Sequence, residues 1–194
     1  CAGLDLVAGE RDLGLAATGE MGIGNTTPAT AILAVLAGVD PAAVTGAGTG
    51  LDEAAIAHKA GVIGRALAVN RPDRDDPWDV LCKVGGLEIA GLVGVILGSA
   101  VRGVPVVVDG FISTSAALIG ARACPRARGY MLSGHRSAEP GHDLMLELLG
   151  LSPILDLGMR LGEGTGAVLA FGVIEAAVRL LDEMATFADA GVAI

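Results

Sequence analysis

The sequence predicts an α/β fold, with three α/β/α layers built around a mainly parallel, Rossmann-like sheet. Short, continuously apolar segments alternate with longer segments rich in small residues, and glycine-rich turns separate them. Continuous apolar strands are typical of parallel sheets that helices cover on both faces. Hydrophobic residues make up 52% of the chain, aromatic residues only 3%, and 30 residues are glycine. This composition favours helices that pack closely on a sheet.

The first elements follow from the turn signals between them. Residues 13–18 are expected to form an apolar strand that runs into the glycine-rich turn of residues 19–27. A helix is expected over residues 28–37, because a proline is tolerated in its first turn. A second helix is expected over residues 51–69, where two early acidic residues suit the positive end of the helix dipole. The polar, proline-bounded residues 70–77 predict a surface loop.

The remaining elements continue the same alternation. An apolar helix is expected over residues 86–100, and residues 104–108 are the clearest buried strand, which ends at Asp109. The elements expected after it are a helix over 113–123, a strand over 130–133, a helix over 141–149, a strand over 154–157 and a last helix from about 164 to beyond 181.

Length, charge and cysteine content limit the possible classes of protein. The 194 residues suit one α/β domain over residues 1–194. A net charge of −9 argues against a nucleic-acid partner, although an anionic small molecule can still bind locally. The longest uncharged apolar stretch, residues 89–101, is too short for a bilayer, which needs about 20 residues. Cys1, Cys82 and Cys124 have no CxxC spacing, and they suggest small buried thiols in a reducing cytoplasm.

Polar side chains gather where the predicted strands end. In open parallel sheets, sites form beyond the carboxyl ends of the strands. Glu20, Asp109, residues 133–139 and residues 160–163 all follow predicted strands. We therefore expect these four turns to converge on one edge of the sheet.

The turn GEMGIGNTT at residues 19–27 is a candidate anion site. Backbone N–H groups at the start of the following helix can face an anion, and Asn25, Thr26 and Thr27 add polar side chains. The segment is not a Walker A loop, because no Gly-Lys-Ser/Thr follows it. It is not a GxGxxG dinucleotide motif either, because position 27 is threonine. A tight turn with a threonine cap explains the residues about equally well.

Other candidates each have a structural alternative. Lys59 is explained by a solvated helix face, and His58 by packing or solvent exposure. Asp109 fits a cap of the following helix better than a ribose ligand on the residues alone. The histidines of residues 133–142 lack the spacing of a metal site, so a polar loop is preferred. Glu163 fits a helix-dipole contact worth about 0.3–1 kcal/mol.

Seven segments together resemble one enzyme family. They are GEMGIGNTTPA, GLDEAAIAHK, GGLEIAG, PVVVDGFI, GHRSAEPGH, LDLGMRLGEGTGA and EMATFADAGV, in this order from about Gly19 onward. The set resembles the nicotinate-nucleotide:dimethylbenzimidazole phosphoribosyltransferases, with Thr165 where serine is expected in many members. The resemblance implies most of the large, nucleotide-binding domain of that family. It also implies that the N-terminal region, which helps form the benzimidazole pocket, is absent here.

The resemblance assigns roles to individual residues. Glu163 matches the catalytic base, Glu20 a second glutamate of the same site, and Lys59 a lysine near the phosphoribosyl group. The further residues that it places in or near the nucleotide pocket are Gly22, Asn25, Thr26, Asp109, Ser137 and Arg160.

The implied reaction transfers the 5-phosphoribosyl group from nicotinate mononucleotide to 5,6-dimethylbenzimidazole. The products are α-ribazole 5′-phosphate, used in assembly of the cobalamin nucleotide loop, and nicotinate. The resemblance implies a homodimer, and the cysteines suggest a cytoplasmic one. Because no phosphate bond is broken in this reaction, we expect no cofactor and no metal. Three alternatives stay open, namely a non-catalytic nucleotide-binding module, an NAD-dependent dehydrogenase and a structural or assembly role. The missing GxGxxG spacing argues against the dehydrogenase.

Overall fold

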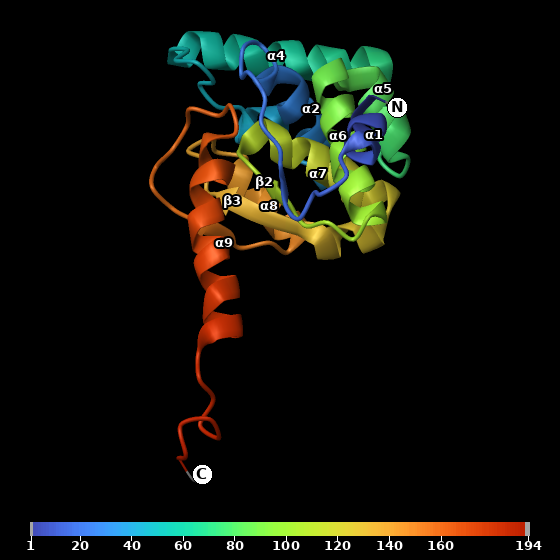
Figure 1. The fold of residues 1–194 in the computed structure, drawn as a ribbon. Coiled ribbons are helices and arrows are strands. Elements are labelled where there is room, and N and C mark those ends of the chain that lie inside the picture. The colour runs from blue at the N-terminus through green and yellow to red at the C-terminus, as the bar shows by residue number, and fades with distance from the viewer. Residues whose placement is uncertain (1, 193–194) are drawn as a thin grey trace.

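A computed structural model describes residues 2–192, and a four-stranded parallel sheet lies at its centre (Figure 1). The strands are β1 (Ala16–Ala17), β2 (Val106–Val108), β3 (Met131–His135) and β4 (Pro153–Leu155), and they lie in the order β1-β2-β3-β4. Each strand therefore pairs with the next one along the chain. Because crossovers between parallel strands are right-handed, this order places the connecting helices on one face of the sheet.

The connecting helices form the main core with that face. Val106 and Val108 contribute from β2, and Ile32, Ile96 and Ile119 are fully buried among the helices. The helices that supply core side chains are α2 (Thr26–Ala37), α3 (Pro41–Val44), α4 (Glu53–Asn70), α5 (Pro77–Val84), α6 (Leu87–Val101), α7 (Phe111–Ala123), η1 (Pro125–Tyr130) and α8 (His142–Leu149). Helix α1 (Ala2–Gly9) packs across α6.

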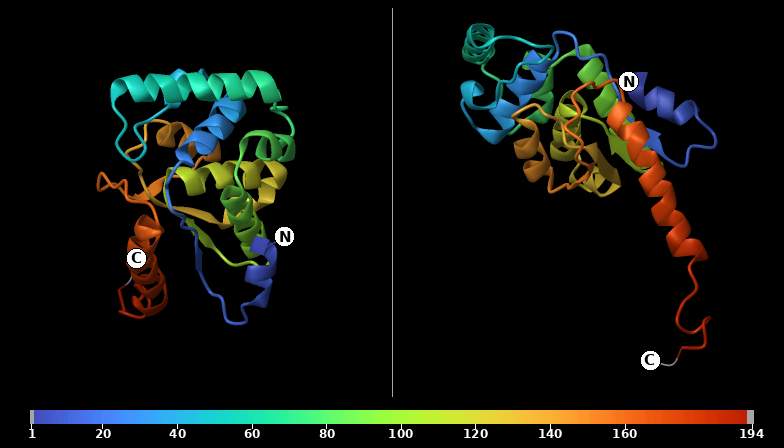
Figure 2. Two further views of the ribbon diagram at one scale, coloured as in Figure 1. Left: turned by 90° about the horizontal axis from the view of Figure 1, so that it is seen from above. Right: turned by 90° about the vertical axis from the view of Figure 1, so that its left-hand side faces the viewer.

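The second face of the sheet is covered by α9 (Thr165–Glu183). Val107, Ala167 and Ala170 form a small second core there. The outer part of α9 extends away from the body of the molecule, as Figure 1 and the right-hand view of Figure 2 show. Leu181 on that outer part is 85% exposed. The α/β fold with helices on both faces of a parallel sheet is confirmed, although one helix forms the second outer layer.

Several elements differ from the sequence prediction. Helices α1, α3 and α5 and the 3₁₀ helix η1 were not predicted. Strands β1, β2 and β4 are shorter than expected, whereas β3 extends two residues further, to His135. Helix α5 begins at Pro77, the last residue of the predicted loop, and Asp76 accepts hydrogen bonds from the N–H groups of Trp78 and Asp79. Cys82 and Cys124 are free thiols but exposed, so the prediction of buried thiols is wrong for both. Cys1 lies outside the described residues.

The apolar stretch predicted over residues 89–101 is helix α6, which packs inside the protein. Its buried side chains include Ile89, Val93 and Ile96. Across residues 2–192, none of the helices combines the length and apolar character needed to cross a bilayer.

Candidate active site

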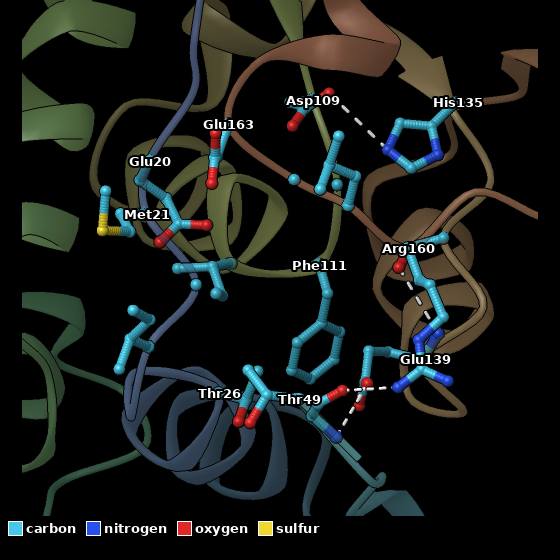
Figure 3. Close-up of a pocket in the computed structure, with 18 of the residues that line it drawn as sticks. Glu20, Met21, Thr26, Thr49, Asp109, Phe111, His135, Glu139, Arg160 and Glu163 are labelled. Atoms are coloured by element: carbon cyan, nitrogen blue, oxygen red, sulfur yellow. Dashed lines mark hydrogen bonds and ion pairs between the residues drawn. The ribbon is translucent and has the colours of Figure 1, made fainter.

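The turns after the strands converge on one cavity of about 700 Å³ (Figure 3). This convergence at the carboxyl edge of the sheet is what the sequence predicts. Residues from four turns line the cavity: Glu20 to Ile23 after β1, Asp109 to Ile112 around the end of β2, His135, Ser137 and Glu139 at and after β3, and Arg160 to Glu163 before α9. Gly48, Thr49 and Gly50 complete the wall from the loop before α4.

Two glutamates lie side by side at one end of the cavity (Figure 3). The backbone N–H of Glu163 donates to the carbonyl oxygen of Glu20 at 3.0 Å, and this bond joins their two turns. Asn25 Nδ2 donates to Glu20 Oε2 at 2.5 Å. Glu163 has a φ of +59°, which is uncommon for a residue with a side chain and costs roughly 1 kcal/mol or more. The fold therefore holds this glutamate in an unfavourable conformation at the cavity wall.

The Glu20 carboxyl is harder to ionise than a free one. Burial raises its pKa, and the negative carboxylates of Asp109, Glu88 and Glu163 add to this effect. The hydrogen bond from Asn25 acts in the opposite direction on the pKa. Raised carboxyl pKa values are typical of groups that exchange protons in catalysis.

Asp109 caps a helix, but not the one that follows it. Its Oδ2 accepts from the Gly164 N–H and its Oδ1 from the Ala167 N–H, each at 3.0 Å. These groups belong to the start of α9, whereas α7, which follows Asp109, has no side-chain cap. The prediction of a cap on the following helix is therefore wrong. The structure instead ties the end of β2 to the turn that carries Glu163.

Positive charge and helix N–H groups lie at the opposite end. Lys59 is 8% exposed, so the solvated-surface interpretation is wrong. Its Nζ donates to Thr26 Oγ1 at 2.8 Å and to the Gly46 carbonyl oxygen at 3.2 Å. Burial lowers the Lys59 pKa, and the nearby Glu139 carboxylate partly offsets this. Lys59 lines a smaller cavity of about 150 Å³, which shares Gly22, Thr26, Gly48 and Thr49 with the large one.

A glycine-rich loop at residues 46–50 joins this end and was missed by sequence reasoning. Glu139 Oε1 accepts from the Gly48 N–H at 3.0 Å, and an Arg160 Nη2 donates to the Gly48 carbonyl oxygen at 2.6 Å. Glu139 Oε2 is buried without a hydrogen-bond partner among the described residues. The signal was present, because TGAGTG at residues 45–50 precedes a helix just as GEMGIGN does.

Helix α2, which follows the turn GEMGIGNTT, has no side-chain cap at its N-terminus. Asn25 occupies the N-cap position of α2, but its side chain bonds to Glu20 and Met21 instead of capping the helix. Thr26 takes its hydrogen bond from Lys59. The alternative of a plain turn with a side-chain cap is therefore not what the structure contains.

The two histidines lie on either side of the polar loop, His135 as the last residue of β3 and His142 as the first residue of α8. His142 Nδ1 accepts from the Ser137 N–H at 2.9 Å. The Thr114 hydroxyl donates to the Gly110 carbonyl oxygen, so it accepts from His142 Nε2, 2.9 Å away. Burial, assisted by His135, lowers the His142 pKa to about 4, so the ring is neutral near pH 7. In the described part of the chain, no three His, Cys, Asp or Glu side chains are grouped to hold a metal ion.

The structure brings most of the residues singled out by the sequence to this site. Those that line the large cavity are Glu20, Gly22, Thr26, Asp109, Ser137, Arg160 and Glu163. Lys59 lines the smaller cavity, and Asn25 donates a hydrogen bond to Glu20. Phe111 and Glu139 also line the large cavity and were not singled out. The two cavities together place a buried cation and helix N–H groups at one end and two carboxylates at the other.

Comparison with known proteins identifies close relatives. The sequence model of a phosphoribosyltransferase family matches residues 1–192. A nicotinate-nucleotide–dimethylbenzimidazole phosphoribosyltransferase from Geobacter metallireducens is 58% identical over 193 residues, which covers 98% of this chain and 55% of the relative. The enzyme of the same name from Desulforamulus reducens is 60% identical over 178 residues, or 92% of this chain and 51% of the relative.

A solved structure agrees with the sequence comparison. The crystal structure of CobT from Thermus thermophilus matches with a TM-score of 0.90 and 44% identity. The match covers 98% of this chain and 57% of that one. The chain thus spans about half the length of the curated relatives that it matches.

Proposed function

Because the chain belongs to the nicotinate-nucleotide–dimethylbenzimidazole phosphoribosyltransferase family, we propose that it carries the phosphoribosyl-transfer site of such an enzyme. The proposed reaction moves the 5-phosphoribosyl group from nicotinate mononucleotide to 5,6-dimethylbenzimidazole. Nicotinate and α-ribazole 5′-phosphate are the products, and the latter serves the nucleotide loop of cobalamin. The supporting observation is the polarity of the two adjoining cavities, with Glu20 and Glu163 on the large one and Lys59 beside a helix N-terminus on the smaller one.

The donor phosphate fits the basic end. Helix N-termini attract phosphate through their free N–H groups and their dipole, and α2 begins at Thr26, which lines both cavities. Lys59 supplies a cation beside it, and Arg160 a second cation across the glycine-rich loop. The ribose then extends toward Ser137 and the glutamates along the cavity wall.

The acceptor ring fits the glutamate end. Exposed apolar side chains surround the carboxylates there, with Met21 at 65% and Leu161 at 66% exposed. A flat benzimidazole can lie on such surfaces while its N–H faces a carboxylate. We assign that carboxylate to Glu163, and Glu20 supports it from the neighbouring turn.

The proposed reaction requires from the protein a general base and a site that aligns the two rings. Nicotinate is bonded to the ribose as a pyridinium, so it leaves as a neutral ring and needs no general acid. A carboxylate that accepts the acceptor's N–H proton raises the nucleophilicity of the opposite nitrogen, typically by about 10²–10⁴ in rate. Holding both rings in line across C1′ supplies further acceleration. In-line attack inverts the β-linked donor to an α-linked product, and no P–O bond breaks, so no cofactor is required.

We also infer a homodimer, as the family resemblance implies, and a cytoplasmic location, as the cysteine pattern suggests. The exposed apolar side chains of the outer part of α9, such as Leu180 and Leu181, offer a surface that association would cover. Light scattering measures the mass in solution, and a monomeric mass for the full-length protein contradicts the dimer.

Product analysis tests the proposed function. The chain, alone and together with the rest of its full-length protein, is incubated with nicotinate mononucleotide and dimethylbenzimidazole, and α-ribazole 5′-phosphate is identified by mass spectrometry. Product from the full-length protein, lost in Glu163→Gln, supports the proposal. Calorimetric binding of the mononucleotide without product from the full-length protein favours a non-catalytic binding module. That alternative stays of interest because the chain spans only about half of its relatives.

A further inference from the structure

Asp109 lines the large cavity, but its carboxylate makes its hydrogen bonds with the backbone. It is 2% exposed, and its own N–H donates to Thr18 Oγ1 at 3.2 Å. Both carboxylate oxygens accept from N–H groups at the start of α9, those of Gly164 and Ala167. Gly164 directly follows Glu163, so Asp109 grips the chain next to the proposed base.

The surroundings leave this turn little freedom. A Cβ on Gly19 would lie 2.6 Å from the Gly164 nitrogen, so the end of β1 presses on the turn from one side. A Cβ on Gly166 would lie 1.9 Å from His135 Cδ2, so the end of β3 presses on it from the other. His135 Nε2 is 3.6 Å from Asp109 Oδ1, too far for a hydrogen bond. The turn that carries Glu163 is therefore held by the hydrogen bonds to Asp109 and by close packing against Gly19 and His135.

We propose that Asp109 is a positioning residue, which fixes the backbone that presents Glu163 instead of binding the ribose of the donor. This inference rests on the proposed function, but part of its test does not need turnover. A carboxylate suits the role because both of its oxygens accept. Asparagine would place an amide N–H₂ against one of the two backbone N–H groups, so one bond would be lost and two donors would meet.

The charge of Asp109 provides a second readout that does not depend on turnover. The negative charges of Asp109, of Glu88 on α6 and of Glu163 before α9 raise the pKa of Glu20. The direct hydrogen bond from Asn25 lowers it. His135 faces Asp109 from β3. Because a neighbouring negative charge raises a carboxyl pKa, removal of the Asp109 charge is expected to lower the pKa of Glu20.

The test compares Asp109→Asn with the matched control Asp76→Asn in the full-length protein. Asp76 also accepts from two backbone N–H groups at a helix start, but it is exposed and lines neither cavity. In Asp109→Asn we expect a fall in kcat of tenfold or more, and a dissociation constant for nicotinate mononucleotide within about twofold. A displacement of about 1 Å at a reacting group can cost on the order of 10²-fold in rate. The control should change neither quantity.

Two further readouts complete the test. Amide hydrogen exchange at Gly164 and Ala167 should accelerate at least tenfold in Asp109→Asn, and this holds even if the wild-type protein forms no product. Carbon NMR of labelled glutamate, assigned with Glu20→Gln, should show Glu20 titrating at lower pH. If Asp109→Asn does not fold, Asp109→Glu keeps the charge but moves it, so kcat should fall while the Glu20 titration stays in place. Tenfold weaker mononucleotide binding with kcat retained, or unchanged exchange at both amides, overturns the inference.

Discussion

Glu163 combines an exposed side chain with a backbone conformation that only the fold enforces. Its φ of +59° lies between two glycines of similar φ, Gly162 and Gly164. The hydrogen bond to Glu20 and the Asp109 contact beside it hold this conformation. A merely favourable helix-dipole contact would not require such a backbone, because any first-turn glutamate can supply it. The conformation thus favours the role of a base directed at a substrate.

Removal of the Glu163 charge should affect chemistry and spare binding. We expect Glu163→Gln to lower kcat by about 10²–10⁴, the usual contribution of a general base, and to leave the mononucleotide dissociation constant nearly unchanged. Initial rates and calorimetry measure the two quantities. Glu53→Gln, in the exposed first turn of α4, is the control. A rate within a few-fold of wild type would exclude Glu163 as the base.

His142 should make the protein sensitive to acid. Its pKa is about 4 in the folded protein against an ordinary value of 6.5, because burial opposes the charged ring. Between these two pH values the unfolded chain binds more protons than the folded one, so stability rises with pH. The contribution is fully present above about pH 6.5 and is lost as the pH falls toward 4.

Denaturant unfolding at pH 7 and pH 4.5 measures this effect. Wild type should lose about 2 kcal/mol more of its unfolding free energy between these pH values than His142→Gln does. The same measurement on His58→Gln, which lies on the exposed surface of α4, should retain the wild-type loss. Equal losses in wild type and His142→Gln would show that the ring is not held neutral.

At the scale of elements, local signals predicted what depends on local structure. Helix α4 has an aspartate cap and acidic first turn that can be read directly, and its predicted bounds differ by two residues at the start and one at the end. Helix α1 has no comparable signal, since it buries only Gly3 and Val7 and depends on packing against α6. Strand β1 shrinks to two residues because only those pair with β2. Pairing partners cannot be read from one segment.

The same limit applies to the site. The glycine-rich turn and the polar turn ends were predictable, and the resemblance assigned Glu20 and Glu163. The partner of Asp109 was not, because the contact joins residues 55 positions apart. The bond between Glu139 and Gly48 joins residues 91 apart. Side-chain chemistry shows what a residue can bond to, whereas the tertiary fold decides which partner it meets.

Lys59 connects two elements, because it lies on α4 and bonds to the start of α2. Its ammonium group touches Thr26 and the carbonyl of Gly46, and it lines the smaller cavity with the loop around Gly48. We expect Lys59→Met to weaken mononucleotide binding tenfold or more, since a charge-assisted phosphate contact contributes about 1.5–3 kcal/mol. The exposed Lys83→Met is the matched control for calorimetry. Unchanged affinity would show that the phosphate does not bind beside Lys59.

The whole molecule should unfold as one unit, because both cores share the same sheet. Val106 and Val108 belong to the large core and Val107 to the small one, so neither core can open without exposing β2. Calorimetric heating should therefore give a single transition, as expected for one domain.

Nicotinate mononucleotide at about 100 times its dissociation constant should add about 2.7 kcal/mol to the free energy of unfolding, which raises Tm by roughly 5–10 °C for a chain of this size. Lys59→Met at the same ligand concentration should show a smaller rise. Two separate transitions, or an equal rise in the variant, would contradict a shared core with the phosphate held beside α2.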